Sequence, residues 1–343
     1  MRILLATDAW EPQVNGVVRT YQRVCEELEG AGHEIHCITP QLYKTLPCPT
    51  YPEIRLAMVT AGRIRKHMQG LQPDVVHIAT EGPIGWATRR SCLATDIPFT
   101  TAYHTRFPEY VTKRLPLPIS WLYHIVKRFH NAGNGIMVAT KSLQDELEER
   151  GFHPLLPWTR GVNTTLFRPR SCRIFGEEPI ALYVGRVAVE KNLEAFLDLD
   201  FVGKKVVVGD GPSLKALQQK YQDVVFTGPK EGEELAACYS SSDVFVFPSR
   251  TDTFGIVLLE AMASGVPIAA YPVTGPIDVV EQGVTGVLHK DLSTAIENAL
   301  KLNRDICRKK ALTYSWQQCG QLFIQNLTAA MQQKTTEPQN TNH

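Results

Sequence analysis

The segment DVFVFPSRTDTFGIVLLEAMASG, residues 243–265, joins a short apolar strand to an apolar helix through a polar loop. We expect the strand to end near Ser249 and the helix to begin near residues 253–255. A buried strand that leads directly into a helix is typical of the units from which parallel sheets are built. The segment therefore predicts an α/β fold. It also leaves two carboxylates to be explained, Asp252 in the loop and Glu260 among apolar residues.

The same alternation of strands and helices extends in both directions along the chain. It is interrupted by the Gly-, Asn- and Pro-containing stretch 160–170 and restarts with the apolar strand 180–187. We therefore expect two Rossmann-like domains, residues 1–170 and 171–315, with ligands bound beyond the carboxyl ends of the strands. A helix over residues 316–333 and a disordered polar tail over residues 334–343 complete the prediction. The strands expected in the first half are residues 3–7, 34–38, 75–79, 99–103 and 136–139.

Composition narrows the class of protein. The 343 residues are 43% hydrophobic and 21% charged, which is typical of a soluble globular chain. The segment MRILLATDAW becomes acidic at Asp8, so it predicts a buried strand and not a secretory signal. No apolar run approaches the ~20 residues that span a bilayer. The 8 cysteines form no CxxC pair, which excludes a common zinc motif and favours a reducing cytoplasm.

Charge is unevenly distributed between the two halves. Residues 1–170 hold 20 Lys and Arg against 15 Asp and Glu, whereas the remainder holds 16 against 20. No dense basic stripe is present, so we expect no nucleic-acid partner. A mildly basic first half leaves contact with a membrane surface open.

Two cations follow the strand that opens the second half. In VGRVAVEKN, residues 184–192, Arg186 lies just past the strand end and Lys191 lies five residues later. Such a pair neutralises a diphosphate without a metal ion, although taken alone both residues are equally explained as solvated loop cations. In GDGP the glycines Gly209 and Gly211 indicate either a phosphate-binding loop or a tight turn. The segment lacks the GxGxxG pattern of dinucleotide-binding proteins.

The two acids of the opening segment each allow two interpretations. Asp252 is placed either to cap the following helix or to bind a ligand. Glu260 lies among residues that should be buried, where an unpaired carboxylate is costly. It therefore forms a buried ion pair or accepts hydrogen bonds from the hydroxyls of a ribose. The free amides near Phe254 and Gly255, at the start of the helix, are placed to receive phosphate oxygens.

The first half offers weaker signals. Asn15 and Gly16 mark a turn into a helix, where a glycine lets the backbone approach a ligand or simply completes the turn. His104 ends the strand predicted over residues 99–103, although a lone histidine is more often structural. Asp8 and Glu81 are similar candidates at other strand ends.

In their order and spacing these motifs resemble the retaining glycosyltransferases of GT-B fold. This large family includes bacterial GDP-mannose-dependent α-mannosyltransferases, sulfoquinovosyl transferases and diacylglycerol glycosyltransferases. The resemblance is carried by PQVNGVVRT, GRVAVEKN, GDGP and the segment 243–265, and it extends over residues 1–330. It implies two Rossmann-like domains facing each other across a cleft. It also implies a C-terminal helix that crosses back toward the first domain.

The resemblance also implies roles for single residues. The family pairs two glutamates as E-x7-E, and here Asp252 stands in place of the first and Glu260 is the second. By resemblance, Glu260 holds the donor ribose, Asp252 binds hydroxyls of the transferred sugar, and no metal ion is needed. The remaining residues implied at the donor are Arg186 and Lys191 at the leaving diphosphate, Gly16, Phe254 and Gly255 beside it, and His104 near the reacting carbon. The catalytic set is thus His104, Arg186, Lys191 and Asp252.

These roles predict a metal-independent, retaining hexosyltransferase that uses a nucleotide-diphosphate sugar. The leading reaction moves α-mannose from GDP-mannose to a membrane lipid or lipid-linked glycan, in the cytoplasm or on the inner face of the membrane. A diacylglycerol glycosyltransferase using UDP-glucose or UDP-glucuronate is the second candidate. A sugar-nucleotide epimerase and a non-catalytic sugar-nucleotide binder are candidates of other classes. The basic segments 62–70 and 118–133 predict either contact with an anionic membrane or ordinary helices facing a core.

Overall fold

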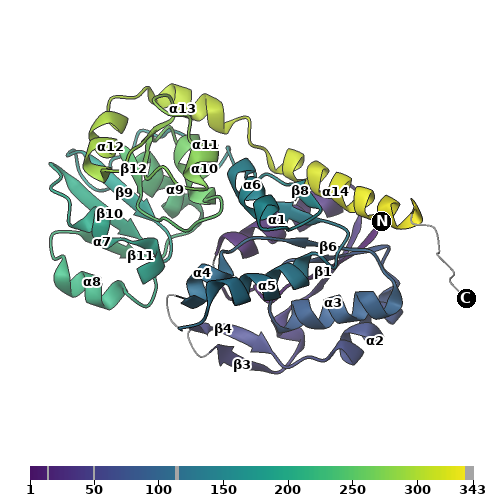
Figure 1. Ribbon diagram of the computed structural model, residues 1–343. Helices are drawn as coiled ribbons and strands as arrows, with labels where there is room; N and C mark the ends of the chain where they lie inside the picture. Colours follow the sequence, from purple (N-terminus) through teal and green to yellow (C-terminus); the bar gives the residue numbers. More distant parts are fainter. Residues whose placement is uncertain (14, 49–50, 113–115, 337–343) are drawn as a thin grey trace, which may run out of the picture. The chain divides into compact units, whose positions relative to one another are not determined.

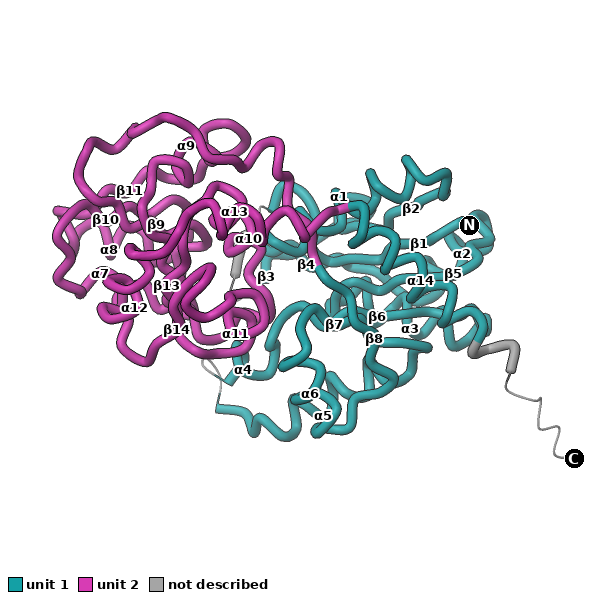
Figure 2. Tube along the Cα trace, turned by 90° about the horizontal axis from the view of Figure 1, so that it is seen from above, with its two compact units in different colours: residues 1–159, 317–343 teal, residues 160–316 magenta. Residues whose placement is uncertain are grey.

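The computed structural model describes residues 1–13, 15–48, 51–112 and 116–336. The chain divides into two compact units, shown in different colours in Figure 2. Unit 1 comprises Met1–Thr159 and Gln317–His343, and unit 2 comprises Arg160–Trp316. Each unit has its own parallel sheet, so the predicted pair of Rossmann-like domains is confirmed.

The sheet of unit 1 runs in the order β2-β1-β5-β6-β7-β8, with every neighbouring pair parallel. The chain builds outward from β1 to β2 and then restarts at β5 on the other side of β1. Such a reversal leaves a crevice at the carboxyl ends of the two central strands, where α/β proteins bind ligands. The strands are β1 (Arg2–Ala6), β2 (Glu34–Ile38), β5 (Val75–Ile78), β6 (Phe99–Ala102), β7 (Ile136–Val138) and β8 (Leu155–Pro157), with a separate hairpin of β3 (Thr45–Cys48) and β4 (Tyr51–Ala57).

Amphipathic helices connect these strands (Figure 1). In α1 the buried side chains Val18, Tyr21, Val24 and Leu28 recur every three or four residues, which places them on one face. Asn15 caps this helix, because its side-chain oxygen accepts hydrogen bonds from two free amides of the first turn. The helices of unit 1 are α1 (Gly16–Gly30), η1 (Pro40–Leu42), α2 (Ala61–Leu71), α3 (Pro83–Thr95), α4 (Phe107–Thr112), α5 (Ile119–His130) and α6 (Lys141–Glu149), and α14 (Trp316–Thr336) continues into this unit.

Unit 2 repeats the arrangement with the order β11-β10-β9-β12-β13-β14. Here the chain restarts between β9 and β12, so the crevice lies at the carboxyl ends of these two strands. The strands are β9 (Ile180–Val184), β10 (Lys204–Val208), β11 (Val225–Gly228), β12 (Val244–Phe247), β13 (Ile268–Ala270) and β14 (Gly286–Leu288). The helices are η2 (Val189–Lys191), α7 (Glu194–Leu197), α8 (Leu214–Lys220), α9 (Gly232–Ser240), α10 (Ile256–Ala263), α11 (Pro276–Val279), α12 (Leu292–Ala299) and α13 (Arg304–Ala311).

The boundary between the units lies earlier than expected. The segment 160–170, which was predicted to end the first domain, belongs to unit 2. The Arg308 guanidinium, on α13, donates to the carbonyl oxygens of Thr164 and Phe167 at 2.8 and 2.6 Å. These bonds join residues more than 140 positions apart, so the local sequence pattern does not reveal them.

Helix α14, yellow in Figure 1, belongs to unit 1 from Gln317 onward. It is the C-terminal helix that was predicted to return toward the first domain. Asn326 donates to the carbonyl oxygen of Pro157 at 3.0 Å, and Trp158 donates to that of Cys319 at 3.2 Å. Phe323 packs against Trp158 with ring centroids 5.0 Å apart. The helix ends at Thr336, beyond the predicted residue 333, and the rest of the predicted tail, residues 337–343, lies outside the described residues.

The glycines of the GDGP segment allow a close approach between two loops of unit 2. A Cβ atom at Gly209 would overlap the carbonyl oxygen of Gly185, and one at Gly211 would overlap that of Val187. Gly209 also has φ +144°, which other residues rarely adopt. The tight-turn interpretation therefore accounts for these glycines.

We predict that Gly209→Ala destabilises unit 2 well beyond the cost of backbone strain. Gly228→Ala is the matched control, because Gly228 has φ +73° but no atom within 4 Å of an added Cβ. The control should lower the unfolding free energy by about 1–2 kcal/mol, and Gly209→Ala by clearly more, since backbone atoms cannot move aside. Urea unfolding followed by circular dichroism measures both. Equal losses in the two variants would contradict the packing role.

Candidate functional site

Two loops meet at the crevice of unit 2, one after β9 and one after β12. Lys191, from the first loop, forms an ion pair with Oδ1 of Asp252, from the second. Asn192 donates to the carbonyl oxygen of Pro248 at 3.1 Å and adds a second link. The structure thus brings together a cation and an acid that lie 61 positions apart in the sequence.

Asp252 does not cap the following helix. The N-cap position of α10 is occupied by Gly255, with φ +85°, which has no side chain to cap the helix. The capping interpretation of Asp252 is therefore wrong. Its Oδ2 atom is buried and has no hydrogen-bond partner within the described ranges. A buried carboxylate oxygen without a donor is costly, so this atom is suited to accept a hydrogen bond from a ligand.

Arg186 follows β9 on a loop that is held by its backbone. The Arg186 carbonyl oxygen accepts a hydrogen bond from the Tyr183 hydroxyl at 2.8 Å. The next amide, of Val187, donates to the carbonyl oxygen of Asp210 at 2.9 Å. Both bonds fix the peptide group that joins Arg186 to Val187. This loop therefore presents its arginine from a rigid base at the crevice.

Glu260 lies within α10 and is 4% exposed. Its Oε2 atom accepts a hydrogen bond from the hydroxyl of Tyr239, on α9, at 2.8 Å. Tyr239 is fully buried, so it holds the carboxylate in one orientation. The sequence did not point to Tyr239 because a contact between two helices leaves no local pattern.

The loop that carries Asp252 and Phe254 packs closely on the segment before α11. Gly275, with φ +92°, would place a Cβ only 3.1 Å from the Asp252 carbonyl oxygen and 3.2 Å from that of Phe254. Phe254 itself is 6% exposed, and Gly255 ends the loop at the start of α10. The amides of this turn therefore lie at the N-terminus of α10, and the turn is held in place by its contact with Gly275.

In unit 1, Asp8 crosses the crevice between β1 and β5. Its carboxylate accepts hydrogen bonds from the amides of Ile84 and Gly85, at 2.8 and 3.2 Å, and from the Thr80 hydroxyl at 3.0 Å. Burial raises the pKa of Asp8 to about 6, and the hydrogen bonds oppose this rise. With both oxygens accepting, Asp8 has the role of fastening β1 to the start of α3. Glu81, next to this site, lies 3.0 Å from Nε2 of His130.

His104 follows β6 and belongs to a buried chain of hydrogen-bonding groups. The Tyr21 hydroxyl lies 2.7 Å from Nε2 of His104 and 2.7 Å from Nε2 of His77. Nδ1 of His77 lies in turn 2.8 Å from the Thr100 hydroxyl. Tyr21 and His77 are fully buried, so they fix the orientation of the His104 ring. The sequence singled out His104 but neither of these partners.

Gly16 is the first residue of α1 and is exposed. Its carbonyl oxygen accepts a hydrogen bond from the Thr20 hydroxyl at 2.6 Å, and Asn15 caps the helix in front of it. Gly16 therefore lies at the N-terminal end of a 15-residue helix that follows the central strand β1.

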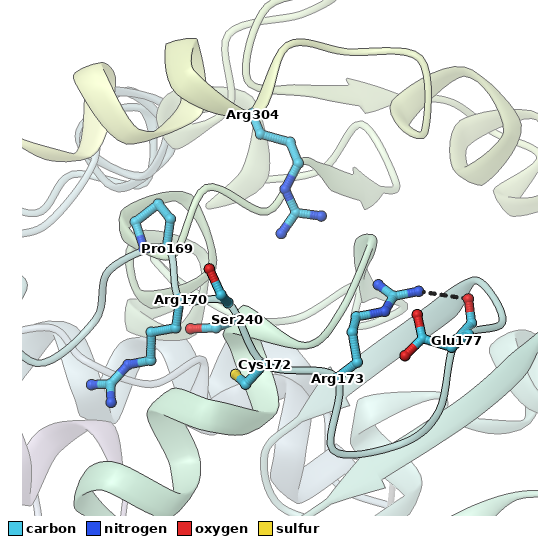
Figure 3. Close-up of a pocket in the computed structure, with 8 residues that line it drawn as sticks. Pro169, Arg170, Cys172, Arg173, Glu177, Ser240 and Arg304 are labelled. Atoms are coloured by element: carbon cyan, nitrogen blue, oxygen red, sulfur yellow. Dashed lines mark hydrogen bonds between the residues drawn. The ribbon is translucent and has the colours of Figure 1, made fainter.

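A cavity of about 590 Å³ lies elsewhere in unit 2 (Figure 3). Its lining includes the arginines Arg170, Arg173 and Arg304, and none of the predicted site residues. Arg173 binds both oxygens of Asp243, at 2.9 and 3.0 Å, and Arg304 donates to the carbonyl oxygen of Ser242. These arginines hold the beginning of unit 2 against its sheet, so the cavity has a structural origin.

Residues 1–13, 15–48, 51–112 and 116–336 contain neither a metal-binding cluster nor a candidate membrane span. There, no three His, Cys, Asp or Glu side chains gather in a way that suits a metal ion. None of the helices in the described ranges combines the length and hydropathy needed to cross a bilayer.

Both units match known family models. Residues 14–166 match the model described as Glycosyltransferase Family 4, and residues 178–305 match Glycosyl transferases group 1. A GDP-mannose-dependent alpha-mannosyltransferase of Corynebacterium glutamicum is 30% identical over 319 residues, which cover 84% of this chain and 76% of the relative. An alpha-monoglucosyldiacylglycerol synthase of Streptococcus pneumoniae is 27% identical, covering 89% of this chain and 80% of the relative.

The fold is also found among solved structures. Sucrose-phosphate synthase of Thermosynechococcus elongatus superposes with a TM-score of 0.78, covering 96% of this chain and 99% of that chain. The two sequences are 21% identical, so this likeness concerns the fold alone.

We predict that the Lys191–Asp252 pair contributes more to stability than an exposed ion pair of unit 2. A double-mutant cycle with Lys191→Met and Asp252→Asn should give a coupling free energy of about 1–3 kcal/mol, because both side chains are about four-fifths buried. The control cycle uses Lys230→Met and Glu234→Gln, an exposed pair in α9 and the turn before it. That coupling should stay below about 0.5 kcal/mol. Urea unfolding measures both cycles, and equal couplings would contradict the burial argument.

Proposed function

Since this chain belongs to the GT-B glycosyltransferases, we propose that it is a retaining hexosyltransferase with GDP-mannose as its leading donor. Use of a nucleotide sugar is common to the family, and the choice of mannose is the proposal. It is supported by the GDP-mannose-dependent relative, which is 30% identical over 84% of this chain. The observation that carries the site assignment is the Lys191–Asp252 pair at the β9–β12 crevice.

The proposed mechanism depends on charge at the leaving diphosphate. As the bond between the sugar and the diphosphate breaks, negative charge grows on the diphosphate and the sugar becomes oxocarbenium-like. Lys191 and Arg186 are assigned to stabilise this charge from the loop after β9. A departing diphosphate oxygen then removes the proton of the attacking acceptor hydroxyl on the same face of the sugar, so the configuration is retained.

The two acids are assigned to orientation of the donor. Asp252 uses Oδ1 to hold Lys191, so its unsatisfied Oδ2 is available for a sugar hydroxyl. Glu260, held by Tyr239, is assigned to the ribose hydroxyls. The amides near Phe254 and Gly255 are assigned to the diphosphate, as is Gly16 of unit 1. His104 completes the assignment as a contact of the donor sugar.

The proposal includes catalysis without a metal ion, because Arg186 and Lys191 supply two positive charges for the diphosphate. It also includes a membrane lipid or lipid-linked glycan as acceptor. The alpha-monoglucosyldiacylglycerol synthase relative supports a lipid acceptor and a glucosyl donor. UDP-glucose or UDP-glucuronate is therefore kept as the second candidate donor. We place the reaction in the cytoplasm, on the inner face of the membrane.

The basic segments of unit 1 are compatible with such an acceptor. In α5 the side chains Leu122, Val126 and Phe129 face the core, and Lys127 and Arg128 lie in the last turn. In α2, Ile64 and Met68 are buried in the same way. Each helix therefore buries an apolar face, as an ordinary helix facing a core does, and contact of their basic residues with a membrane is part of the proposal.

The donor is tested by thermal shift of the purified chain with GDP-mannose, UDP-glucose and UDP-glucuronate, each with and without EDTA. One donor should raise the melting temperature, with no effect of EDTA, because only the folded chain binds it. A shift that EDTA removes would contradict the metal-free site. Conversion of a donor to its epimer without any acceptor would favour the epimerase instead.

Transfer to an extracted membrane lipid then tests the site residues. Lys191→Met should lower kcat by about 10²–10³-fold, because it removes a charge that acts on the leaving group. Glu260→Gln should mainly weaken donor binding. Lys230→Met is the matched control, because it also removes one positive charge from unit 2 but at a residue outside the assigned site. This variant should keep wild-type rates. Wild-type rates in Lys191→Met would refute the assignment.

Tyr21→Phe tests whether Tyr21 positions His104. The variant keeps the ring and removes the hydroxyl that lies between His104 and His77, so kcat should fall about tenfold and its pH profile should shift. Tyr123→Phe, which removes a buried hydroxyl that donates to Glu109 at 2.6 Å, is the control and should change neither. An unchanged kcat and pH profile in Tyr21→Phe would mean that this hydroxyl only packs.

A further inference from the structure

Two cysteines of unit 1 are in contact, one on a helix and one on the neighbouring strand. Cys25 lies on α1 and Cys37 on β2, and their Sγ atoms are 4.0 Å apart. Both are free thiols, and both side chains are half-buried. Because β2 is an edge strand of its sheet, this contact is open to small solutes. We call Cys25 and Cys37 the thiol pair.

The contact makes the two thiols chemically different. A hydrogen bond from the Cys25 thiol lowers the pKa of Cys37, although burial and the Glu29 carboxylate oppose this effect. The same bond raises the pKa of Cys25, as do burial and the carboxylates of Glu29 and Glu26. The thiolate is the reactive form of cysteine, so Cys37 is the nucleophile of the pair and Cys25 is the thiol that reacts second.

Other cysteines of the chain have the properties of purely structural thiols. Cys92, on α3, is 1% exposed, and burial raises its pKa to about 12. Burial likewise raises the pKa of Cys238 and of Cys307 to about 11. Such thiols stay protonated at neutral pH and pack as small apolar side chains. The thiol pair differs from them because it is partly exposed and its two sulfurs are in contact.

Helix α1 connects the thiol pair to the candidate site. Tyr21 lies one helical turn before Cys25, so the two side chains lie on the same side of the helix. The Tyr21 hydroxyl lies 2.7 Å from Nε2 of His104 and holds its ring. A covalent bond between the sulfurs requires them to come about 2 Å closer. Strand β2 is hydrogen-bonded to β1 in the sheet, so α1 is the element that moves.

We propose that the thiol pair is an oxidation site, at which a hydroperoxide produces a disulfide between α1 and β2 that displaces Tyr21 from His104. Formation of this disulfide is independent of the proposed function. Its effect on the rate of sugar transfer rests on that function, in which His104 contacts the donor sugar. A disulfide formed in a reducing cytoplasm is transient, so the modification is reversible.

The oxidation has two steps. The Cys37 thiolate attacks one oxygen of the hydroperoxide, the O–O bond breaks, and Cys37 becomes a sulfenic acid. The departing oxygen takes up the proton that the Cys37 thiol had released. The Cys25 sulfur then attacks the sulfenic sulfur, and the hydroxyl group leaves with the Cys25 proton as water. Two thiols are oxidised to one disulfide, and hydrogen peroxide is reduced to two molecules of water.

Peptide mapping tests the oxidation site. The full chain is treated with hydrogen peroxide, alkylated with iodoacetamide and digested without reductant. A peptide that joins Cys25 to Cys37 should appear, and dithiothreitol should remove it. Cys172 is the control, because it is also half-buried but its Sγ atom lies 3.4 Å from the Ser241 hydroxyl, and it should remain alkylated. Absence of the joined peptide would overturn the proposal, as would equal linkage of Cys25 or Cys37 to other cysteines.

Single variants test the order of the two steps. Cys25→Ser should stop at the sulfenic acid of Cys37, which dimedone labels. Cys37→Ser should leave Cys25 unlabelled, because its thiol stays protonated. The reverse pattern of labelling would overturn the assignment of Cys37 as the nucleophile.

Two readouts test the displacement of Tyr21. The NMR signals of the His104 ring, assigned with His104→Gln, should shift on oxidation of the wild type and return with dithiothreitol. The rate of sugar transfer should fall about tenfold, as in Tyr21→Phe, and recover in the same way. Cys25→Ser/Cys37→Ser is the control and should respond to peroxide in neither readout. An unchanged His104 signal in the disulfide-linked chain would overturn the coupling, as would an equal loss of rate in the double variant.

Failure here is distinguishable from failure of the proposed function. Peptide mapping and the His104 signals need neither a donor nor an acceptor. A chain that forms the disulfide and shifts the His104 signals, but transfers no sugar when reduced, would count against the proposed function alone. A chain that transfers sugar but forms no disulfide would count against the thiol pair alone.

Discussion

The ion pair between Lys191 and Asp252 is the contact on which the candidate site depends. Strands β9 and β12 are neighbours in the sheet, but the loops that follow them are separated by the whole of β10, β11 and the helices between. Without a link, the conformation of each loop would be independent of the other. The ion pair and the bond from Asn192 to Pro248 join them, and Gly275 lets a third loop pack against the same turn. The loop that carries Arg186 and the start of α10 are thereby held at the carboxyl ends of these two strands.

Two aspartates at equivalent crevices show how the surroundings of a carboxylate separate a structural role from a binding role. Asp8 and Asp252 both follow a central strand of their sheet. Both oxygens of Asp8 accept hydrogen bonds from the start of α3 or from Thr80, so each already has a donor within the protein. Asp252 keeps a buried oxygen without a donor among the described residues. The accounting of hydrogen bonds therefore favours Asp252 as the ligand-binding acid, which is the role proposed for it above.

Much of the fold could be predicted because strands and helices have local periods, and the motifs identified the family correctly. The errors and omissions concern contacts between distant residues. The boundary was placed at residue 170 because the bonds from Arg308 to Thr164 and Phe167 are invisible locally. Capping stayed open as one of two interpretations of Asp252, because its cation lies 61 positions away in the sequence. Tyr21, His77 and Tyr239 were missed for the same reason.

The return of α14 to unit 1 has a consequence for the order in which the chain is made. Unit 2 is one continuous stretch, Arg160–Trp316, whereas unit 1 is completed only by residues that follow it. During synthesis on the ribosome, Trp158 lacks its contact partners Phe323 and Cys319 until the whole of unit 2 has been made. The unit that is synthesised first therefore completes its aromatic core only after the second unit has been synthesised.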